Sequence, residues 1–171
     1  QASKSSQTGS INKFTASGKK EAKKNLALLA MAYGHVYVAQ IALGSNPAKA
    51  IQAIKEAESY NGPSLIICYC PCAEQHIKGG LVNSIKEEKK AVECGYFTTF
   101  RYDPRLRDVE GKSPLTFDCP EPDFSKLRDF IMQETRFAQL PIVNPEHAEE
   151  LLQKCEFYAK RRYADIKKFG N

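Results

Sequence analysis

The sequence predicts an α/β domain in which helices flank a parallel sheet, followed by a C-terminal helical arm. Two apolar segments rich in β-forming residues, at 35–43 and 64–70, stand on either side of a helical pattern at 48–60. This strand–helix–strand order is typical of parallel sheets. Both strand segments are almost continuously apolar, which is the pattern of strands that are covered on both faces.

The first fifth of the chain divides into an irregular segment and a helix. Residues 1–20 are rich in Ser, Thr, Gly and Lys, with Ile11 and Phe14 as their only sizeable apolar anchors, so we expect no regular element there. Residues 21–33 carry leucine, alanine and tyrosine at helical spacing, and Gly34 follows where a helix would end.

Asn46 and Pro47 mark the start of the helix at 48–60. Asparagine is a preferred N-cap, and proline is tolerated at the first helical position because its missing N–H would have no partner there. The Asn-Gly-Pro sequence at 61–63 ends the helix. We expect one face of this helix to be apolar through Ile51, Ile54 and Ala57.

The remaining chain is predicted to contain three helices, one strand and one long loop. We expect a charged helix at 80–94, a strand at 96–102, a loop at 103–122, a helix at 123–138, and a long charged helix from 145 to about 168. The inner face of the first of these helices is expected to carry Leu81, Ile85 and Val92.

We expect two parts in the chain, an α/β domain at 1–140 and a charged helical arm at 141–171. The lysines and arginines of the arm are interpreted as a solvated face. Its few apolar residues are expected to pack along a surface of this chain or of a neighbour: Leu151, Leu152, Phe157 and Tyr158.

The composition excludes several classes of protein. The 171 residues are 42% hydrophobic and 26% charged, which suits one globular domain. No apolar run approaches the ~20 residues of a membrane span, and no segment has the order of a signal peptide. The net charge of +5 is small and scattered, so we expect no nucleic-acid partner, no membrane partner and a cytoplasmic location. The first residue is Gln1 rather than Met, which favours a fragment or a processed product.

Three of the six cysteines crowd into Cys68-Tyr69-Cys70-Pro71-Cys72, at the end of the second predicted strand. Reduced thiols are expected because the chain has no secretory signal. Alternate residues of a strand share a face, so Cys68 and Cys70 are expected to lie together in the core as small hydrophobic side chains. Pro71 cannot continue a strand ladder, which leaves Cys72 as the thiol most free to bind a ligand.

Three roles for Cys72 remain open from the residues alone. A self-contained zinc site needs paired ligand motifs, and the chain has no Cys-x-x-Cys pair. A catalytic nucleophile needs a base, which His76 could provide from four residues further on. In a third role, Cys72 gives one thiolate to an iron–sulfur cluster whose other ligands lie outside the chain.

Several blocks in order along the chain carry a family resemblance: residues 1–4, 28–42 (LLAMAYGHVYVAQIA), 53–63 (AIKEAESYNGP), 64–72 (SLIICYCPC), 87–95 (EEKKAVECG) and the helix start at 123–127. Together they resemble the C-terminal portion of pyruvate:ferredoxin (flavodoxin) oxidoreductase. The resemblance weakens after Arg101 and in the last thirty residues. It implies that the fold is the last part of a thiamine-diphosphate-binding α/β domain.

The resemblance also implies a cofactor set and one ligand. Cys72, in Pro71-Cys72, matches a thiolate ligand of the [4Fe–4S] cluster nearest the thiamine, whereas Cys68 and Cys70 match no ligand. The segment Gln1, Ser3 and Lys4 would lie beside thiamine diphosphate and its Mg²⁺ without being assigned as ligands. No catalytic residue is implied. The intact enzyme, a homodimer, would oxidise pyruvate with coenzyme A and pass electrons to ferredoxin or flavodoxin.

The chain also departs from the family pattern, and alternatives follow. The Gly-Asp-Gly thiamine motif and the paired cysteines of the proximal cluster do not occur in it, so we expect no activity from these residues alone. The same module could belong to a pyruvate:NADP⁺ oxidoreductase. The intact enzyme could also lie in an organelle of an anaerobic eukaryote. Two other classes are a non-catalytic interaction module that presents its charged C-terminal helix, and a small hydrolase that uses Cys72 and His76.

Overall fold

The computed structural model describes residues 3–72 and 77–170 and contains one four-stranded sheet in the order β2-β1-β3-β4. The strands are β1 (Tyr37–Ile41), β2 (Ser64–Cys68), β3 (Phe100–Tyr102) and β4 (Leu115–Phe117). β1 is parallel to β2 but antiparallel to β3, which is antiparallel to β4. The prediction of a parallel sheet was therefore wrong for two of the three strand pairs. Strands buried on both faces look alike in either direction, and direction depends on the end from which the chain enters the sheet.

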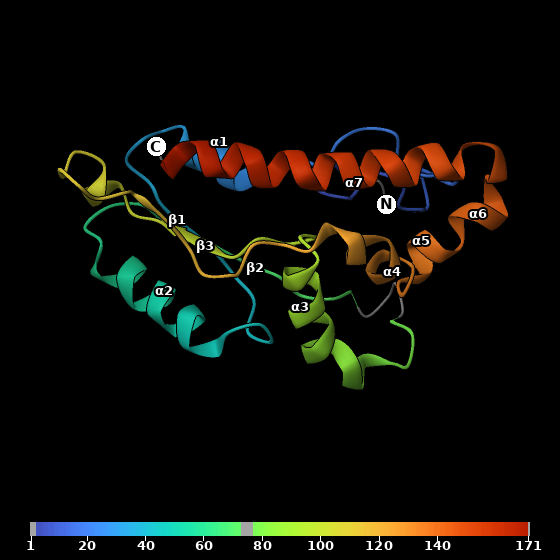
Figure 1. Cartoon of the computed structure of the whole chain (residues 1–171), viewed down its shortest axis with the longest axis horizontal. Helices are drawn as coiled ribbons and strands as arrows, with labels where there is room; N and C mark the ends of the chain where they lie inside the picture. The colour runs from blue at the N-terminus through green and yellow to red at the C-terminus, as the bar shows by residue number, and fades with distance from the viewer. Residues whose placement is uncertain (1–2, 73–76, 171) are drawn as a thin grey trace.

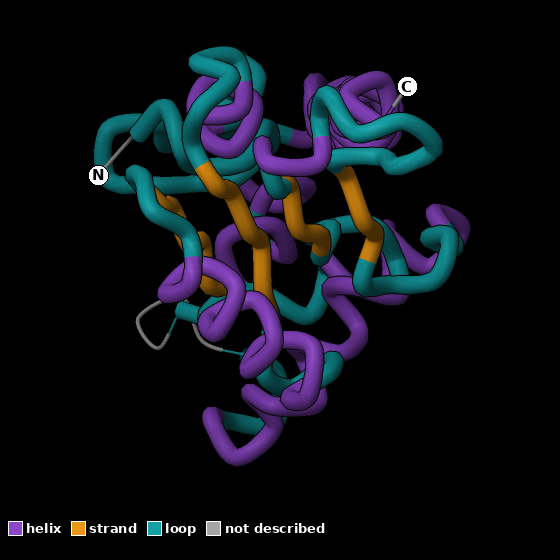
Figure 2. The backbone as a smooth tube through the Cα atoms, turned by 90° about the vertical axis from the view of Figure 1, so that its left-hand side faces the viewer, coloured by secondary structure: helices purple, strands orange, loops and turns teal. Residues whose placement is uncertain are grey.

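Helices cover both faces of the sheet (Figure 1). α1 (Leu26–Met31) and the long α7 (Pro145–Lys167) lie along one face, and α2 (Pro47–Ser59) lies against the other. Figure 2 shows the four strands side by side between these layers. Neighbouring residues of β1 point to opposite sides and are both fully buried: Val38 packs with α1 and α7, and Tyr37 packs with α2. The expectation of a strand covered on both faces is confirmed for β1.

The remaining helices form a second core next to the sheet. α3 (Ser84–Glu93), α4 (Leu127–Ile131), α5 (Thr135–Ala138) and α6 (Leu140–Val143) contribute to it together with α7. The predicted helix at 123–138 is broken, because a 3₁₀ turn at 124–126 precedes α4 and a separate helix follows it. The predicted loop at 103–122 contains β4, which the sequence reading missed.

The N-terminal segment is irregular as expected, and its two halves pair with each other. The backbone N–H of Gly9 donates to the carbonyl of Lys19, and the N–H of Lys24 donates to the carbonyl of Lys4. This pairing shortens the predicted helix at 21–33 to α1. Asn25 caps α1 by accepting a hydrogen bond from the N–H of Leu28 at 3.2 Å.

The predicted apolar face of α2 was wrong for Ile51 and Ile54, whereas Ala57 packs against the core as expected. Ile51 and Ile54 are 53% and 48% exposed, while Ala50 and Ala53 are buried against β1 and β2. Small side chains let the helix axis approach the sheet closely, and this turns the isoleucines outward. The same correction applies to two of the three residues predicted for the helix at 80–94, since Leu81 and Ile85 are exposed and Val92 is buried.

The C-terminal helix packs over its own chain. α7 buries Leu151, Leu152 and Cys155 in the second core and Ile166 against the sheet, whereas Phe157 stays exposed. The division into a domain at 1–140 and an arm at 141–171 stays a prediction. Among the residues of the described ranges, no helix has the length and apolar character needed to cross a membrane.

Candidate functional site

The three neighbouring cysteines lie at the C-terminal end of β2, which is an edge strand of the described sheet. Cys68 pairs with Ile41 of β1, and the N–H of Tyr69 donates one further bond to the carbonyl of Ile41 at 2.9 Å. The ladder therefore ends two residues before Pro71, whereas the sequence predicted a strand that continues to Cys70. Tyr69 is the residue that packs inward, with its ring centroid 5.9 Å from that of Tyr96.

The prediction that Cys68 and Cys70 are buried was wrong, because both are exposed. The expected alternation is present, but no strand of the described chain lies beyond β2 to cover its outer side. Alternation predicts which residues share a face and does not predict which face is covered. The thiol of Cys70 makes a weak contact with the carbonyl of Pro71, at 3.6 Å.

Cys72 is exposed just after the strand, as expected from Pro71. Within the described ranges, no group of three or more His, Cys, Asp or Glu residues could hold a metal ion. His76 and Gln1 lie outside the described residues, so the pairing of Cys72 with His76 is not tested.

A cavity of about 350 Å³ opens where the N-terminal segment, the ends of β1 and β2, and α7 meet. Cys68, Tyr69 and Cys70 form part of its wall, and Tyr96 and Phe97 form another part. Ligands of open α/β sheets commonly bind at the carboxyl ends of strands, next to the point where the strand order reverses. The cavity lies at the carboxyl ends of the parallel pair β1 and β2, which contribute Gln40, Ile67 and Cys68 to its wall.

Four cationic side chains line this cavity from three separate parts of the chain: Lys23 with Lys24, Arg136, and Arg162. Arg162 of α7 donates to Oε1 of Gln7 at 3.1 Å and to the carbonyl of Tyr96 at 3.4 Å. Arg136 donates to the Tyr96 hydroxyl at 3.2 Å and forms an ion pair with Glu134. Burial raises the pKa of Glu134, and Arg136 opposes that shift.

Burial and neighbouring cations together lower the pKa of Lys23 from its ordinary value of 10.5 to about 8. Burial is the largest cause, and the charges of Arg162, Arg136, Lys19 and Lys24 follow in that order. Burial also lowers the pKa of Arg162. The sequence reading missed this cluster. Arg136 and Arg162 stand far from Lys23 in the chain, so no local motif signals that they meet.

Ser3 and Lys4, expected beside a thiamine cofactor, line an adjoining open groove of about 500 Å³. Lys19, Lys23 and Lys24 line the same groove. Both residues are exposed, and the Ser3 hydroxyl accepts a hydrogen bond from the N–H of Ser5 at 3.1 Å. A groove with this excess of ammonium groups suits an anion such as a diphosphate.

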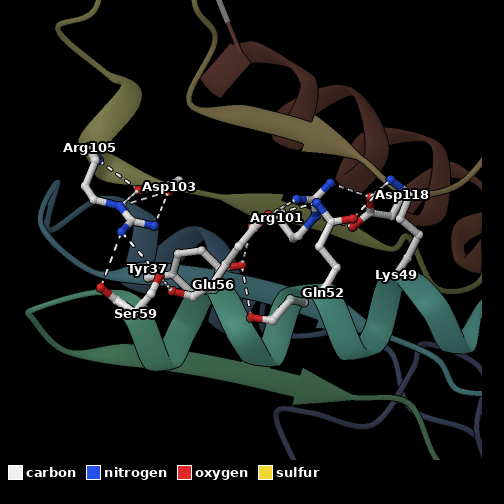
Figure 3. A network of polar contacts seen from close by, with 10 residues as sticks. Tyr37, Lys49, Gln52, Glu56, Ser59, Arg101, Asp103, Arg105 and Asp118 are labelled. Atoms are coloured by element: carbon white, nitrogen blue, oxygen red, sulfur yellow. Dashed lines mark hydrogen bonds and ion pairs between the residues drawn. The ribbon is translucent and has the colours of Figure 1, made fainter.

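A third polar cluster joins β3, β4 and α2 and has a structural role (Figure 3). Arg101 donates to both oxygens of Asp118, at 2.7 and 2.9 Å, and to Glu56 at 2.5 Å. Glu56 also accepts from the Tyr37 hydroxyl at 3.0 Å. These charged groups pair with one another. The cluster therefore holds the sheet to α2 and leaves few hydrogen-bond donors or acceptors available to a ligand.

The chain is homologous to a segment of the pyruvate:ferredoxin and pyruvate:flavodoxin oxidoreductases. It is 46% identical over 170 residues to pyruvate:ferredoxin oxidoreductase of Moorella thermoacetica, a match that covers 99% of this chain and 14% of that protein. It is 43% identical over 170 residues to pyruvate-flavodoxin oxidoreductase of Klebsiella pneumoniae, with the same shares covered.

A relative with a different electron acceptor in its name also matches. Pyruvate dehydrogenase [NADP(+)], mitochondrial, of Euglena gracilis is 41% identical over 151 residues, which are 88% of this chain and 8% of that protein. No family model matches the chain. The chain thus spans about one seventh of the length of the first two relatives, 14% in each case.

Proposed function

We propose that this chain is the C-terminal part of the thiamine-binding domain of an enzyme that oxidatively decarboxylates pyruvate. In this reaction pyruvate and coenzyme A give acetyl-CoA, CO₂, two electrons and a proton, and the electrons leave through [4Fe–4S] clusters to ferredoxin or flavodoxin. The observation that carries the proposal is 43–46% identity along essentially the whole chain to enzymes named for this chemistry.

Cys72 is proposed as one thiolate ligand of the cluster nearest the thiamine. Its position supports this role, since the thiol is exposed shortly after the carboxyl end of β2. The described part of this chain contains no group of three or more His, Cys, Asp or Glu residues that could hold a metal ion, so a cluster at Cys72 would take further ligands from elsewhere in the polypeptide. Bound there, a [4Fe–4S] cluster accepts and passes on single electrons, and burial and hydrogen bonds set its potential.

Ser3 and Lys4 are proposed to lie beside thiamine diphosphate and Mg²⁺. The groove that they line fits the group chemically, since exposed ammonium groups attract a diphosphate and the Ser3 hydroxyl can share a hydrogen bond with it. The thiamine supplies the carbanion chemistry of decarboxylation. The residues of this chain hold the charged end of the cofactor, and they perform no proton transfer in this proposal.

The runner-up is the same segment in a pyruvate:NADP⁺ oxidoreductase, which the match to the Euglena enzyme favours. Electron-acceptor specificity separates the two. The whole polypeptide encoded by the gene is purified without oxygen, supplied with thiamine diphosphate, Mg²⁺, pyruvate and coenzyme A, and offered ferredoxin, flavodoxin or NADP⁺. Acetyl-CoA formation coupled to reduction of ferredoxin or flavodoxin is expected. Coupling to NADP⁺ alone supports the runner-up, and no turnover with any acceptor refutes both.

A further inference from the structure

The side chains that line the cavity between the N-terminal segment and α7 carry an excess of positive charge. Lys23, Lys24, Arg136 and Arg162 line it, and the ion pair between Arg136 and Glu134 is the only one that neutralises any of them within residues 3–72 and 77–170. Four cations and one carboxylate leave three charges uncompensated. Repulsion among partly buried like charges costs folding free energy, and such arrangements are characteristic of sites that bind a ligand of opposite charge.

Arg162 shows the lack of compensation most clearly. Its guanidinium is half-buried, and its two hydrogen-bond acceptors, the Gln7 amide oxygen and the Tyr96 carbonyl, are both neutral. The neighbouring Arg161 is exposed and lies 3.7 Å from the carboxylate of Asp165. A guanidinium that points into a cavity with neutral partners keeps donors available for an anion, whereas Arg161 already has its counter-ion.

We propose that this cavity is a binding site for a phosphate group attached to a flat or apolar body. Three uncompensated cations attract a dianion, and a guanidinium presents its donors in a fork that fits phosphate oxygens. Tyr69, Tyr96 and Phe97 line the same cavity and offer an aromatic wall for the body of the ligand. The volume of about 350 Å³ is at the lower end of small-molecule pockets, roughly 300–1,000 Å³.

This site adjoins the groove at Ser3 and Lys4 and shares Lys23 and Lys24 with it, whereas Arg136, Arg162 and the aromatic wall line this site alone, and none of the residues of either is Cys72. Arg162→Gln therefore tests this site without changing the groove, and the iron content tests the cluster ligand of the proposed function. A polypeptide that binds a phosphate here and holds no cluster would overturn only the proposed function. One that holds its cluster and binds no anion here overturns only this inference.

The test measures binding of sulfate, inorganic phosphate and phenyl phosphate to the whole polypeptide by calorimetry. We expect all three to bind, and phenyl phosphate to bind more tightly than phosphate because of the aromatic wall. Arg162→Gln and Lys23→Gln should each weaken sulfate binding at least tenfold. The matched controls Arg161→Gln and Lys20→Gln, which change exposed side chains next to this site, should leave the affinity within twofold. Equal weakening in the controls means a diffuse surface effect and overturns the proposal.

The pH dependence is a second readout. Lys23 faces Arg162 from α7, Arg136 from the region of α5, and Lys19 and Lys24 from its own segment. Sulfate keeps its charge across this range, so its affinity should fall as the pH rises through about 8 and Lys23 becomes neutral. This fall should vanish in Lys23→Gln, a variant that removes one peripheral side chain and so keeps the test open if Arg162→Gln does not fold. Absence of sulfate binding at pH 7, or unchanged affinity in both variants, refutes the site.

Discussion

Arg101 is the residue whose loss should damage this fold most through electrostatics. Its side chain is 9% exposed and that of its partner Asp118 is 3% exposed. In Arg101→Met the carboxylate of Asp118 would keep only Lys49, at 3.8 Å, and Glu56 would lose its ion pair as well. Breaking a buried pair by removing one partner leaves an uncompensated charge, which costs about 3–5 kcal/mol. We expect a loss in the upper half of that range, because two carboxylates lose the same partner.

Urea unfolding of this chain, followed by circular dichroism, measures that cost. Arg105→Met is the matched control: Arg105 also holds an aspartate, Asp103, but is 43% exposed, so its loss should cost at most about 1 kcal/mol. The double variant Arg101→Met/Asp118→Leu should recover part of the loss, since no buried charge remains at 118. If Arg101→Met costs no more than Arg105→Met, the reasoning about burial is wrong.

Three further predictions concern other parts of the fold. Lys23→Met should stabilise the chain by about 1–2 kcal/mol at pH 7, which is less than the full pKa shift implies because the site is partly hydrated. The native pKa of about 8 lies below the unfolded value of 10.5, so the stability of the parent chain rises with pH between these values and the advantage of the variant shrinks. Urea unfolding at pH 7 and pH 10 measures this change. Leu151→Ala should cost about 2–5 kcal/mol in the same assay, against a few tenths for Phe157→Ala on the exposed face; equal costs would contradict packing of α7 on this chain. Asn46→Ala should cost about 1 kcal/mol by removing the cap at the N–H of Lys49, and Ala48→Ser, two residues further on in the first turn of α2, should cost less.

The elements with strong local signals were predictable from the sequence. The Asn46-Pro47 start, the two strands at 37–41 and 64–68, and the long helix from Pro145 all occur near their expected bounds. Each has a signal of its own, such as a cap, a break or a continuous apolar run. β4 has only three residues and gains its partner from β3, so nothing in its own sequence separates it from a loop.

Burial was predicted less well than secondary structure, because it depends on what lies opposite. Helical spacing correctly places Ile51 and Ile54 on one side of α2, but alanines on the other side allow the closer approach to the sheet. Strand alternation likewise places Cys68 and Cys70 together, and the edge position of β2 decides that they are exposed. Local pattern gives the face, and tertiary packing decides which face is covered.

One part of the candidate site could be predicted from local sequence, and another part depends on tertiary packing. Cys72 could be singled out from the sequence, because Pro71 acts on its immediate neighbour. The cationic cavity could not, since its four cations meet only after α5, α7 and the N-terminal segment have packed together. The comparisons explain why so much of the chemistry lies elsewhere: the chain matches 14% of the enzymes that it resembles.

The content of iron and acid-labile sulfide in the whole polypeptide tests the central claim, that Cys72 is a cluster ligand, most directly. The parent, Cys72→Ser and the matched control Cys70→Ser are purified without oxygen and compared per polypeptide. The account predicts that Cys72→Ser loses at least one and up to about four iron atoms, the content of one [4Fe–4S] cluster, while Cys70→Ser keeps the parent value. Full iron content in Cys72→Ser, or an equal loss in Cys70→Ser, would contradict the assignment.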